Sequence, residues 1–138
     1  MRIVAVDPGG KRLGLAVGDD LTGVVTPLQV IPYAGRHPAS RTIASAASAH
    51  GAEVVVLGLP TSAEGDETPG CARTHALAAA LAEIGIVAET QPEHLSTREA
   101  RRRAAAAGRR RGEPVDDLAA CVILEDYLST RPRKGDRS

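Results

Sequence analysis

The chain contains no phenylalanine and no tryptophan, and Tyr33 and Tyr127 are its only aromatic residues. Proteins that read single-stranded nucleic acid usually stack its bases on aromatic rings, so the sequence nearly excludes that mode of recognition. A core without these rings must be built from valine, isoleucine, leucine and alanine. Such small aliphatic side chains favour helices that pack closely on a sheet.

Cysteine is also scarce, since only Cys71 and Cys121 are present and no C-x-x-C motif occurs. A disulfide framework is therefore not expected. Cys71 and His75 have the i, i+4 spacing of one helix face, but two ligands do not make a zinc site. No run approaches the roughly 18 apolar residues of a membrane span, and the first residues lack the pattern of a secretory leader. We therefore expect a cytoplasmic protein that contacts no membrane.

Basic and acidic residues balance over the 138 residues, 17 against 17, but they are unevenly placed. Residues 1–97 carry 6 basic and 10 acidic side chains, whereas residues 98–138 carry 11 and 7. A basic final third indicates a polyanionic partner, with a solvated basic face as the alternative. The length predicts one domain, at residues 1–129, followed by a disordered tail at 130–138.

Apolar runs and turn residues predict five strands and four helices. The strands are predicted at 3–6, 12–17, 24–31, 53–58 and 86–90, and the helices at 39–50, 70–84, 96–107 and 115–128. Short connections make the first three strands an antiparallel meander, with Pro27 at an edge or a bulge. The later strands alternate with helices. The order predicts an α/β fold, with three antiparallel strands, then two parallel strands, and helices on both faces.

Three carboxylates occupy positions from which strand or helix geometry could direct them to one point. Asp7 ends the first strand, Glu93 follows the fifth strand in a loop, and Asp116 opens the last helix. Carboxylates that hold two Mg²⁺ ions about 4 Å apart form a phosphodiester hydrolase site. Each acid also has a simpler interpretation. Asp7 could accept turn amides, Glu93 could face water, and Asp116 could cap the helix in competition with Asp117.

The chain resembles the YqgF/RuvX family in motifs that follow one another over nearly its whole length. These motifs are Asp7-x-Gly9-x-Lys11-Arg12-x-Gly14, Gly58-Leu59-Pro60, Glu93-x-Leu95-Ser96-Thr97-x-Glu99, and Val115-Asp116 through Ala119-Ala120 to Tyr127. The resemblance implies a ribonuclease H-like fold related to Holliday junction resolvases. It also implies a nuclease of ribosome biogenesis that processes the 5′ end of the 16S ribosomal RNA precursor. Asp7, Glu93 and Asp116 would be its catalytic acids and its ligands for Mg²⁺ or Mn²⁺.

The chain departs from the family pattern in two places. Pro92 and His94 flank Glu93 where the family commonly has an aspartate and an arginine. The loop at 61–65 also differs from the family's usual sequence. These changes bear on catalytic competence more than on the fold.

Arginine is concentrated in one segment, where seven arginines fall within residues 98–111 and Glu99 is the only acid. The guanidinium group binds phosphate through paired donors, so we expect this segment to contact nucleic acid. The resemblance adds the basic pair after the first strand. The residues assigned to nucleic-acid contact are Lys11, Arg12, Arg98, Arg101, Arg102, Arg109, Arg110 and Arg111.

The leading hypothesis is a Mg²⁺-dependent endonuclease, monomer or homodimer, that acts on structured RNA. One alternative is the resolution of branched, four-way DNA, which would need a dimer to cut two strands symmetrically. Another is a non-catalytic factor that binds nucleic acid through the same basic surface. The glycine-rich turn after Asp7 also resembles the phosphate loop of actin-like ATPases, but a chain of this length cannot supply their second lobe.

Overall fold

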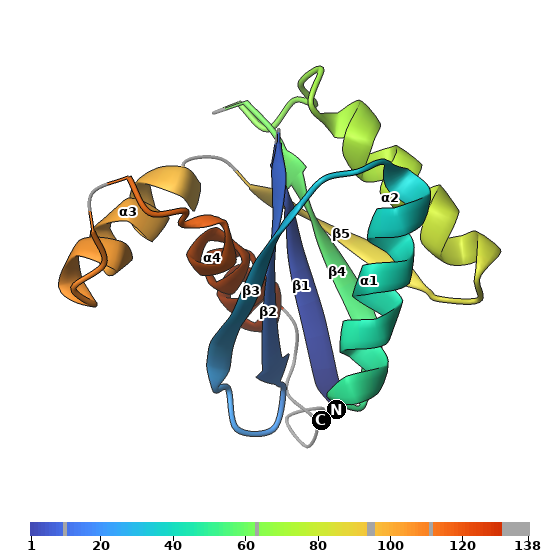
Figure 1. Ribbon diagram of the computed structural model, residues 1–138, viewed down its shortest axis with the longest axis horizontal. Coiled ribbons are helices and arrows are strands. Elements are labelled where there is room, and N and C mark those ends of the chain that lie inside the picture. The colour runs from blue at the N-terminus through green and yellow to red at the C-terminus, as the bar shows by residue number, and fades with distance from the viewer. Residues whose placement is uncertain (10, 63, 94–95, 111, 131–138) are drawn as a thin grey trace.

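The computed structural model describes residues 1–9, 11–62, 64–93, 96–110 and 112–130. A five-stranded sheet with the order β3-β2-β1-β4-β5 lies at the centre (Figure 1). The strands are β1 (Arg2–Pro8), β2 (Arg12–Asp19), β3 (Val25–Pro32), β4 (Ala52–Pro60) and β5 (Ala88–Glu93). The predicted mixed sheet is confirmed, because β1, β2 and β3 pair antiparallel and β4 and β5 run parallel to β1.

Two proline positions follow from this topology. Pro27 lies in the edge strand β3, next to a register shift between Leu15 and Ala16 of β2, as its residue type predicts. Pro92 lies in the other edge strand, β5, where a missing amide donor costs little.

The predicted fifth strand was displaced by a few residues. The structure begins β5 at Ala88 and extends it to Glu93, because β4 continues to Pro60 and pairs with β5 along this length. Val87 precedes the strand and is 71% exposed. Glu93 is therefore the last residue of a strand, and its predicted place in a loop was wrong.

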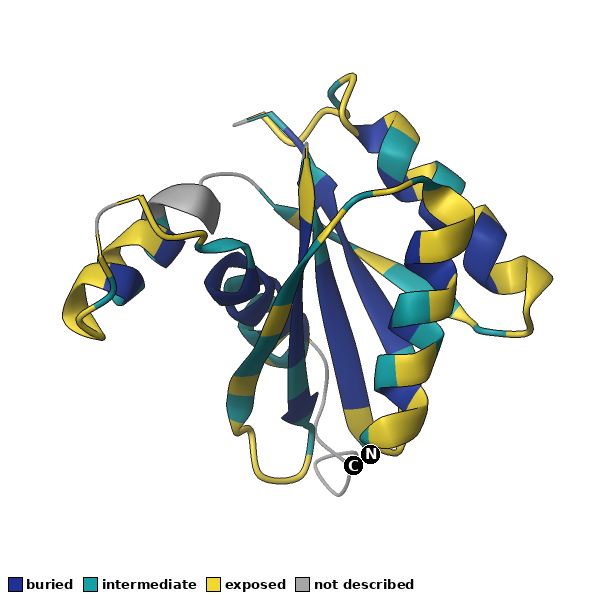
Figure 2. Cartoon of the chain, viewed as in Figure 1, coloured by how far each residue is buried: buried dark blue, intermediate teal, exposed yellow. Residues whose placement is uncertain are grey.

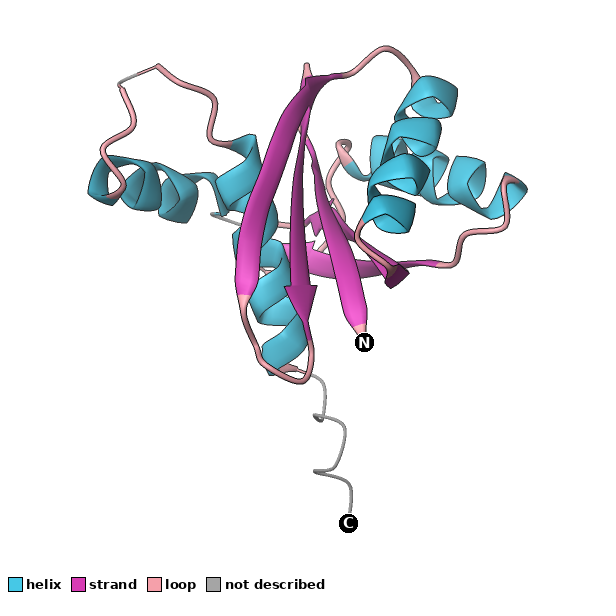
Figure 3. Ribbon diagram, turned by 60° about the horizontal axis from the view of Figure 1, so that its bottom comes forward, coloured by secondary structure: helices cyan, strands magenta, loops and turns pink. Residues whose placement is uncertain are grey.

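Helices cover both faces of the sheet (Figures 1 and 3). The helices α1 (Arg36–Ala49) and α2 (Cys71–Glu83) cover one face, and α4 (Asp116–Ser129) covers the other. The helix α3 (Ser96–Ala106) packs on α4 and not on the sheet. The first helix begins three residues earlier than predicted, because Pro38 falls in its first turn, where proline is tolerated.

The core divides between the two faces of the sheet (Figure 2). Val4 and Val6 of β1 pack among α1 and α2, whereas Ile3 and Ala5 pack against α4. Alternation of this kind is expected for a strand buried on both faces. Within the described part of the chain, no helix is long and apolar enough to cross a membrane.

The single-domain boundary at 129 and the tail from 130 stay predictions, and residues 131–138 lie outside the described part.

Candidate metal and nucleic-acid site

The alternation of side chains along β1 places Asp7 on the α4 face of the sheet. Ile3 and Ala5 of the same strand are buried against Ile123 and Leu124 of α4. Alternate residues of a strand point to the same face, and Asp7 is the next residue of this series. It lies at the carboxyl end of β1, where the sheet no longer buries it completely.

Glu93 reaches the same face from β5. Glu89, four residues earlier, accepts a hydrogen bond from the Tyr127 hydroxyl of α4 at 2.9 Å. This contact identifies the residues of β5 that face α4, and Glu93 is one of them. Because β1, β4 and β5 run parallel, the ends of β1 and β5 that carry Asp7 and Glu93 lie at one edge of the sheet.

Asp116 is placed by a close contact between α4 and β2. A Cβ atom built on Gly14 would lie 1.8 Å from the Asp116 carbonyl oxygen, so the first turn of α4 rests on the bare backbone of β2. Gly14 is also the cross-strand partner of Asp7. The buried Ala119 and Ala120, one turn further on, allow the helix to keep this approach. Asp116 and Asp7 are therefore neighbours.

The two aspartates affect each other electrostatically. Burial raises the pKa of Asp7 to about 7, and the negative charge of Asp116 adds to the rise. Arg12 donates from Nε to Asp116 Oδ1 at 3.1 Å. No ion pair with Asp7 is found in the described part of the chain. Among the described residues, Arg12 is thus the one cation that forms an ion pair with these two acids.

Glu93 does not complete a three-acid cluster with this pair. Burial, a hydrogen bond shared with Asp126 of α4, and the charges of Asp126 and Asp7 raise the pKa of Glu93 to about 9. Among the residues that the structure describes, no three acidic, histidine or cysteine side chains are grouped to hold one metal ion. The structure therefore brings Asp7 and Asp116 together and places Glu93 beside Asp126, within electrostatic reach of Asp7.

Asp117 has a structural partner of its own. It is 7% exposed, and Arg109 donates to its two carboxylate oxygens at 2.8 and 2.9 Å. Its Oδ1 also accepts the Leu118 amide at 3.0 Å. These bonds anchor the segment before α4, so Asp116 is the acid that remains for the site.

Two arginines assigned to nucleic-acid contact, Arg102 and Arg109, form ion pairs, as does Arg103 of the same segment. Arg102 pairs with Glu99, and Arg103 pairs with Glu99 and with Glu125 of α4. Arg109 pairs with Asp117 as described. Their contact with nucleic acid stays a prediction, and Arg102 keeps 76% of its side-chain exposure beside its ion pair.

Other predicted contact residues are exposed. Lys11, Arg101 and Arg110 lie at the surface, and Arg12 retains 51% of its side-chain exposure while it pairs with Asp116. Arg111 and the side chain of Arg98 lie outside the described part of the chain, as does His94.

Sequence reasoning missed two residues near the acids. Asp126 lies in the middle of a helical sequence, where nothing distinguishes it from a solvent-facing acid. Arg73 of α2 donates to the Gly9 carbonyl oxygen at 2.6 Å, although it belongs to no recognisable motif. Both contacts depend on tertiary packing that the local pattern does not encode.

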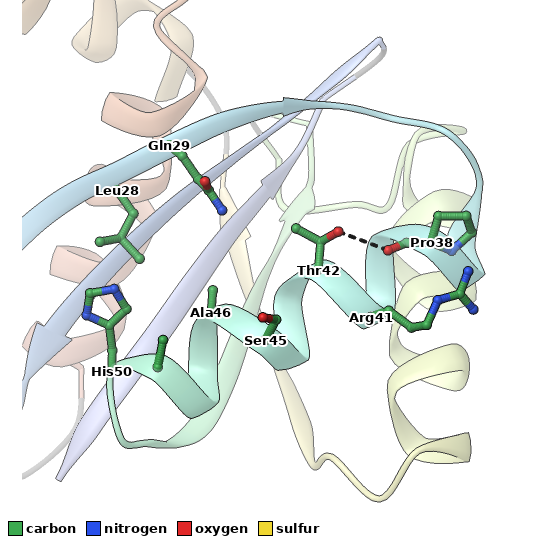
Figure 4. Close-up of a pocket in the computed structure, with 9 residues that line it drawn as sticks. Leu28, Gln29, Pro38, Arg41, Thr42, Ser45, Ala46 and His50 are labelled. Carbon is green, nitrogen blue, oxygen red and sulfur yellow. Dashed lines mark hydrogen bonds between the residues drawn. The ribbon is translucent and has the colours of Figure 1, made fainter.

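A groove on the other face of the sheet is separate from the acids (Figure 4). It lies between α1 and the edge strand β3, and Thr42 donates to the Pro38 carbonyl oxygen at 3.1 Å along its helical wall. Its lining contains no acid. The lining residues are Leu28, Gln29, Pro38, Arg41, Thr42, Ser45, Ala46, Ala49 and His50.

The acid pair fits a hard divalent cation. Mg²⁺ binds in proteins through one or two carboxylates and keeps several waters, and Asp7 and Asp116 provide two carboxylates side by side. The raised pKa of Asp7 records the unfavourable charge that such a cation would neutralise. Cys71 and His75 do not make a comparable site, because Cys71 donates to the Pro60 carbonyl oxygen and His75 contacts Glu67.

Known structures share this architecture. The Thermus thermophilus RuvC protein in complex with a Holliday junction matches with a TM-score of 0.56 and 16% identity over 93% of this chain and 94% of that one. The fowlpox virus resolvase bound to Holliday junction DNA matches with a TM-score of 0.54 and 14% identity over 94% of this chain and 98% of that one. At this identity the likeness shows the fold, which is ribonuclease H-like as predicted.

Sequence comparison gives a narrower result. Proteins named "Putative pre-16S rRNA nuclease" from Chlorobaculum tepidum and Myxococcus xanthus are 35% and 33% identical, over 94% and 99% of this chain and 94% and 93% of their own lengths. A third, from Alcanivorax borkumensis, is 32% identical over 92% of this chain and 95% of its own length. The sequence model of the RuvX family, described as Holliday junction resolvase, matches residues 1–130. The chain belongs to the RuvX family.

Proposed function

We propose that this protein is a divalent-metal-dependent endonuclease that cleaves structured RNA in the cytoplasm, with the 5′ end of the 16S ribosomal RNA precursor as its substrate. The observation that carries the proposal is the pairing of Asp7 with Asp116 across Gly14. Two neighbouring carboxylates, one with its pKa raised to about 7, repel each other when both are charged, and a bound cation would relieve this repulsion. The names of the relatives support the choice of RNA.

Asp7 and Asp116 would hold the cation, which is Mg²⁺ or Mn²⁺, and Glu93 would join them after it leaves Asp126. When bound there, the cation would activate the attacking water and stabilise the leaving oxygen of phosphodiester hydrolysis. Lys11, which is exposed on the turn after β1, would bind the substrate phosphate. Arg12 bonds to Asp116 through Nε alone, so its two terminal nitrogens would be available to bind a phosphate.

One assay tests this function directly. The pure protein is incubated with precursor ribosomal RNA, a four-way DNA junction or a plain duplex, in Mg²⁺, Mn²⁺ or EDTA. We expect cleavage of the precursor RNA that requires metal and falls by at least about 100-fold in Asp7→Asn and in Asp116→Asn. Glu53→Gln, an exposed acid at the opposite end of β4, is the matched control and should cut normally.

Two results would overturn the proposal. Cleavage that survives both substitutions would come from a contaminating nuclease. RNA binding that is unchanged by EDTA and leaves the RNA intact would identify a non-catalytic binding factor.

Resolution of branched DNA is the second candidate, favoured by the description of the family as a Holliday junction resolvase. Symmetric cutting of two strands needs two active sites, so this function requires a homodimer. Paired, symmetric nicks in the four-way junction, together with an intact precursor RNA, would establish it in place of the first.

A further inference from the structure

Arg73 reaches the candidate site from the opposite side of the sheet. It belongs to α2, whereas Asp7 faces α4. Its Nη1 donates to the carbonyl oxygen of Gly9 at 2.6 Å, a contact that joins residues 64 positions apart. Gly9 lies in the turn between β1 and β2, so Arg73 holds the turn that follows Asp7.

A ring contact holds the guanidinium in place. The Cζ atom of Arg73 lies 4.1 Å from the centre of the Tyr33 ring, at the distance of a cation–π interaction. The backbone amide of Tyr33 in turn donates to the carbonyl oxygen of Lys11 at 2.9 Å. Arg73 therefore bonds to the turn at Gly9, and the Tyr33 backbone bonds to it at Lys11. The side chains of Arg73 and Tyr33 stack on each other.

This turn packs against Asp116 of the acid pair. A Cβ atom built on Gly9 would lie 3.1 Å from Asp116 Oδ2, so the Gly9 backbone lies against that carboxylate. The same turn leads into Arg12, which donates to Asp116 Oδ1. A movement of the turn would therefore change the space around one oxygen of Asp116 and the ion pair of the other.

We propose that Arg73 is a positioning residue of the nuclease, which holds the β1–β2 turn against Asp116 and so sets the room for the cation and the direction of Lys11. This inference rests on the proposed function. Catalytic groups misplaced by about 1 Å can lose about 100-fold in rate, so a loose turn should reduce turnover more than binding of the long RNA.

Metal binding distinguishes a positioning role of Arg73 from a purely electrostatic effect of its charge. Removing a cation near two carboxylates should tighten Mn²⁺ binding if electrostatics alone acts. Loss of the turn's position should weaken it. We expect Arg73→Gln to weaken Mn²⁺ binding by at least about 3-fold in calorimetric titration of the full chain, and Arg73→Lys, which can still donate and stack, to recover part of the loss.

The cleavage arm measures the split between turnover and binding. Arg73→Gln should lower kcat on the precursor RNA by at least about 10-fold, with KM changed by less than about 3-fold. Tyr33→Leu keeps the Gly9 hydrogen bond but removes the stack, so it should give a smaller loss in the same direction. Arg41→Gln, an exposed arginine of α1, is the matched control and should change neither quantity.

The outcomes are distinguishable from failure of the proposed function. If Arg73→Gln lowers the melting temperature but leaves Mn²⁺ affinity unchanged or tighter, Arg73 only stabilises the fold and the inference is overturned. Should Arg73→Gln not fold, Arg73→Lys and Tyr33→Leu decide the same question by the same titration. If the wild-type protein binds Mn²⁺ but cuts none of the nucleic acids, the proposed function fails, and the titration still decides the role of Arg73.

Discussion

Asp7 stands in an environment that disfavours its charge. It is largely buried at the end of β1, beside Asp116, and its pKa is raised to about 7 as a result. Arg12 balances Asp116 from the exposed side, while Glu93 shares a proton-dependent contact with Asp126. The sequence shows that these acids lie at the ends of strands and helices. Their protonation depends on neighbours that only the folded structure brings close.

Asp7→Asn should stabilise the metal-free protein at alkaline pH. Between pH 3.8 and about 7 the unfolded chain releases the Asp7 proton while the folded chain keeps it. Stability therefore falls as the pH rises through this window, and the full penalty is present above it. With EDTA, the variant should melt at least about 3 °C above wild type at about pH 8.5.

The same comparison at about pH 4 serves as the control, because most Asp7 side chains are then protonated in the folded protein. Added Mn²⁺ should raise the melting temperature of wild type but not of the variant. An equal difference at both pH values would mean that the substitution acts through packing and not through charge.

Arg12→Gln should have opposite effects on the two ligands. It removes a cation beside Asp116, so Mn²⁺ should bind about 2-fold to 5-fold more tightly. It also removes the proposed phosphate contact, so RNA should bind more weakly and the slope of log affinity against log salt should fall by about 1. Calorimetry and filter binding measure the two effects. Weaker Mn²⁺ binding would show that Arg12 orients Asp116 for the cation and does not compete with it.

At the scale of elements, the contact between α4 and β2 decides whether Asp116 reaches the site. The backbone of α4 touches the sheet at Gly14, and the buried Ala119 and Ala120 continue the close approach. The motif with glycine in the second strand and alanines in the last helix could be seen in the sequence. The reason for it, one backbone resting on another, required the structure.

Gly14→Ala should separate α4 from the sheet. Its Cβ would meet the Asp116 carbonyl oxygen at 1.8 Å, and backbone cannot yield as a side-chain tip can. We expect a loss of at least about 3 kcal/mol in the free energy of unfolding, measured by urea denaturation, and no Mn²⁺ stabilisation. Gly70→Ala is the matched control, because the nearest atom to its Cβ would be the side-chain atom Pro60 Cγ at 3.2 Å, and it should cost less than about 1 kcal/mol. Similar losses in both variants would contradict the close approach.

Arg109 and Arg110, which precede α4, should differ in role, the first stabilising the fold and the second binding RNA. Arg109→Gln leaves the buried Asp117 carboxylate without its cationic partner and should cost about 2–4 kcal/mol of stability. Arg110 is exposed, so Arg110→Gln should leave stability within about 0.5 kcal/mol and weaken RNA binding. Urea denaturation and RNA binding of the two variants give the comparison. A stable Arg109→Gln protein would show that Asp117 finds another donor.

At the scale of the whole molecule, much of the fold was predictable. The β-branched runs of β1 and β4 and the short connections of the meander indicate the mixed sheet, and glycines mark helix ends, as at Gly85 and Gly108 with φ of 83° and 78°. The displacement of β5 was not predictable, because its register follows the length of β4 and not its own polar sequence. For the same reason the sequence placed Glu93 in a loop.

The distribution of ring side chains predicts how the protein recognises nucleic acid. Tyr127 is buried and bonded to Glu89, and the Tyr33 ring carries Arg73. One ring is buried and the other is half-buried beside Arg73, so recognition should depend on phosphate geometry. RNAs with the same secondary structure but altered stem sequences should bind within about 3-fold of each other, and all should weaken steeply with salt. A preference above about 30-fold for one stem sequence would contradict this expectation.

Asp7 and Asp116 come from opposite ends of the polypeptide, since one ends the first strand and the other opens the last helix. During synthesis, a ribosome releases the sheet-forming segments well before α4. A chain interrupted after β5 would therefore carry one aspartate without its neighbour, and its β2 glycine would have no helix resting on it. Because α4 supplies Asp116, a chain that stops before this helix would lack the acid pair proposed to hold the cation and should not cleave RNA.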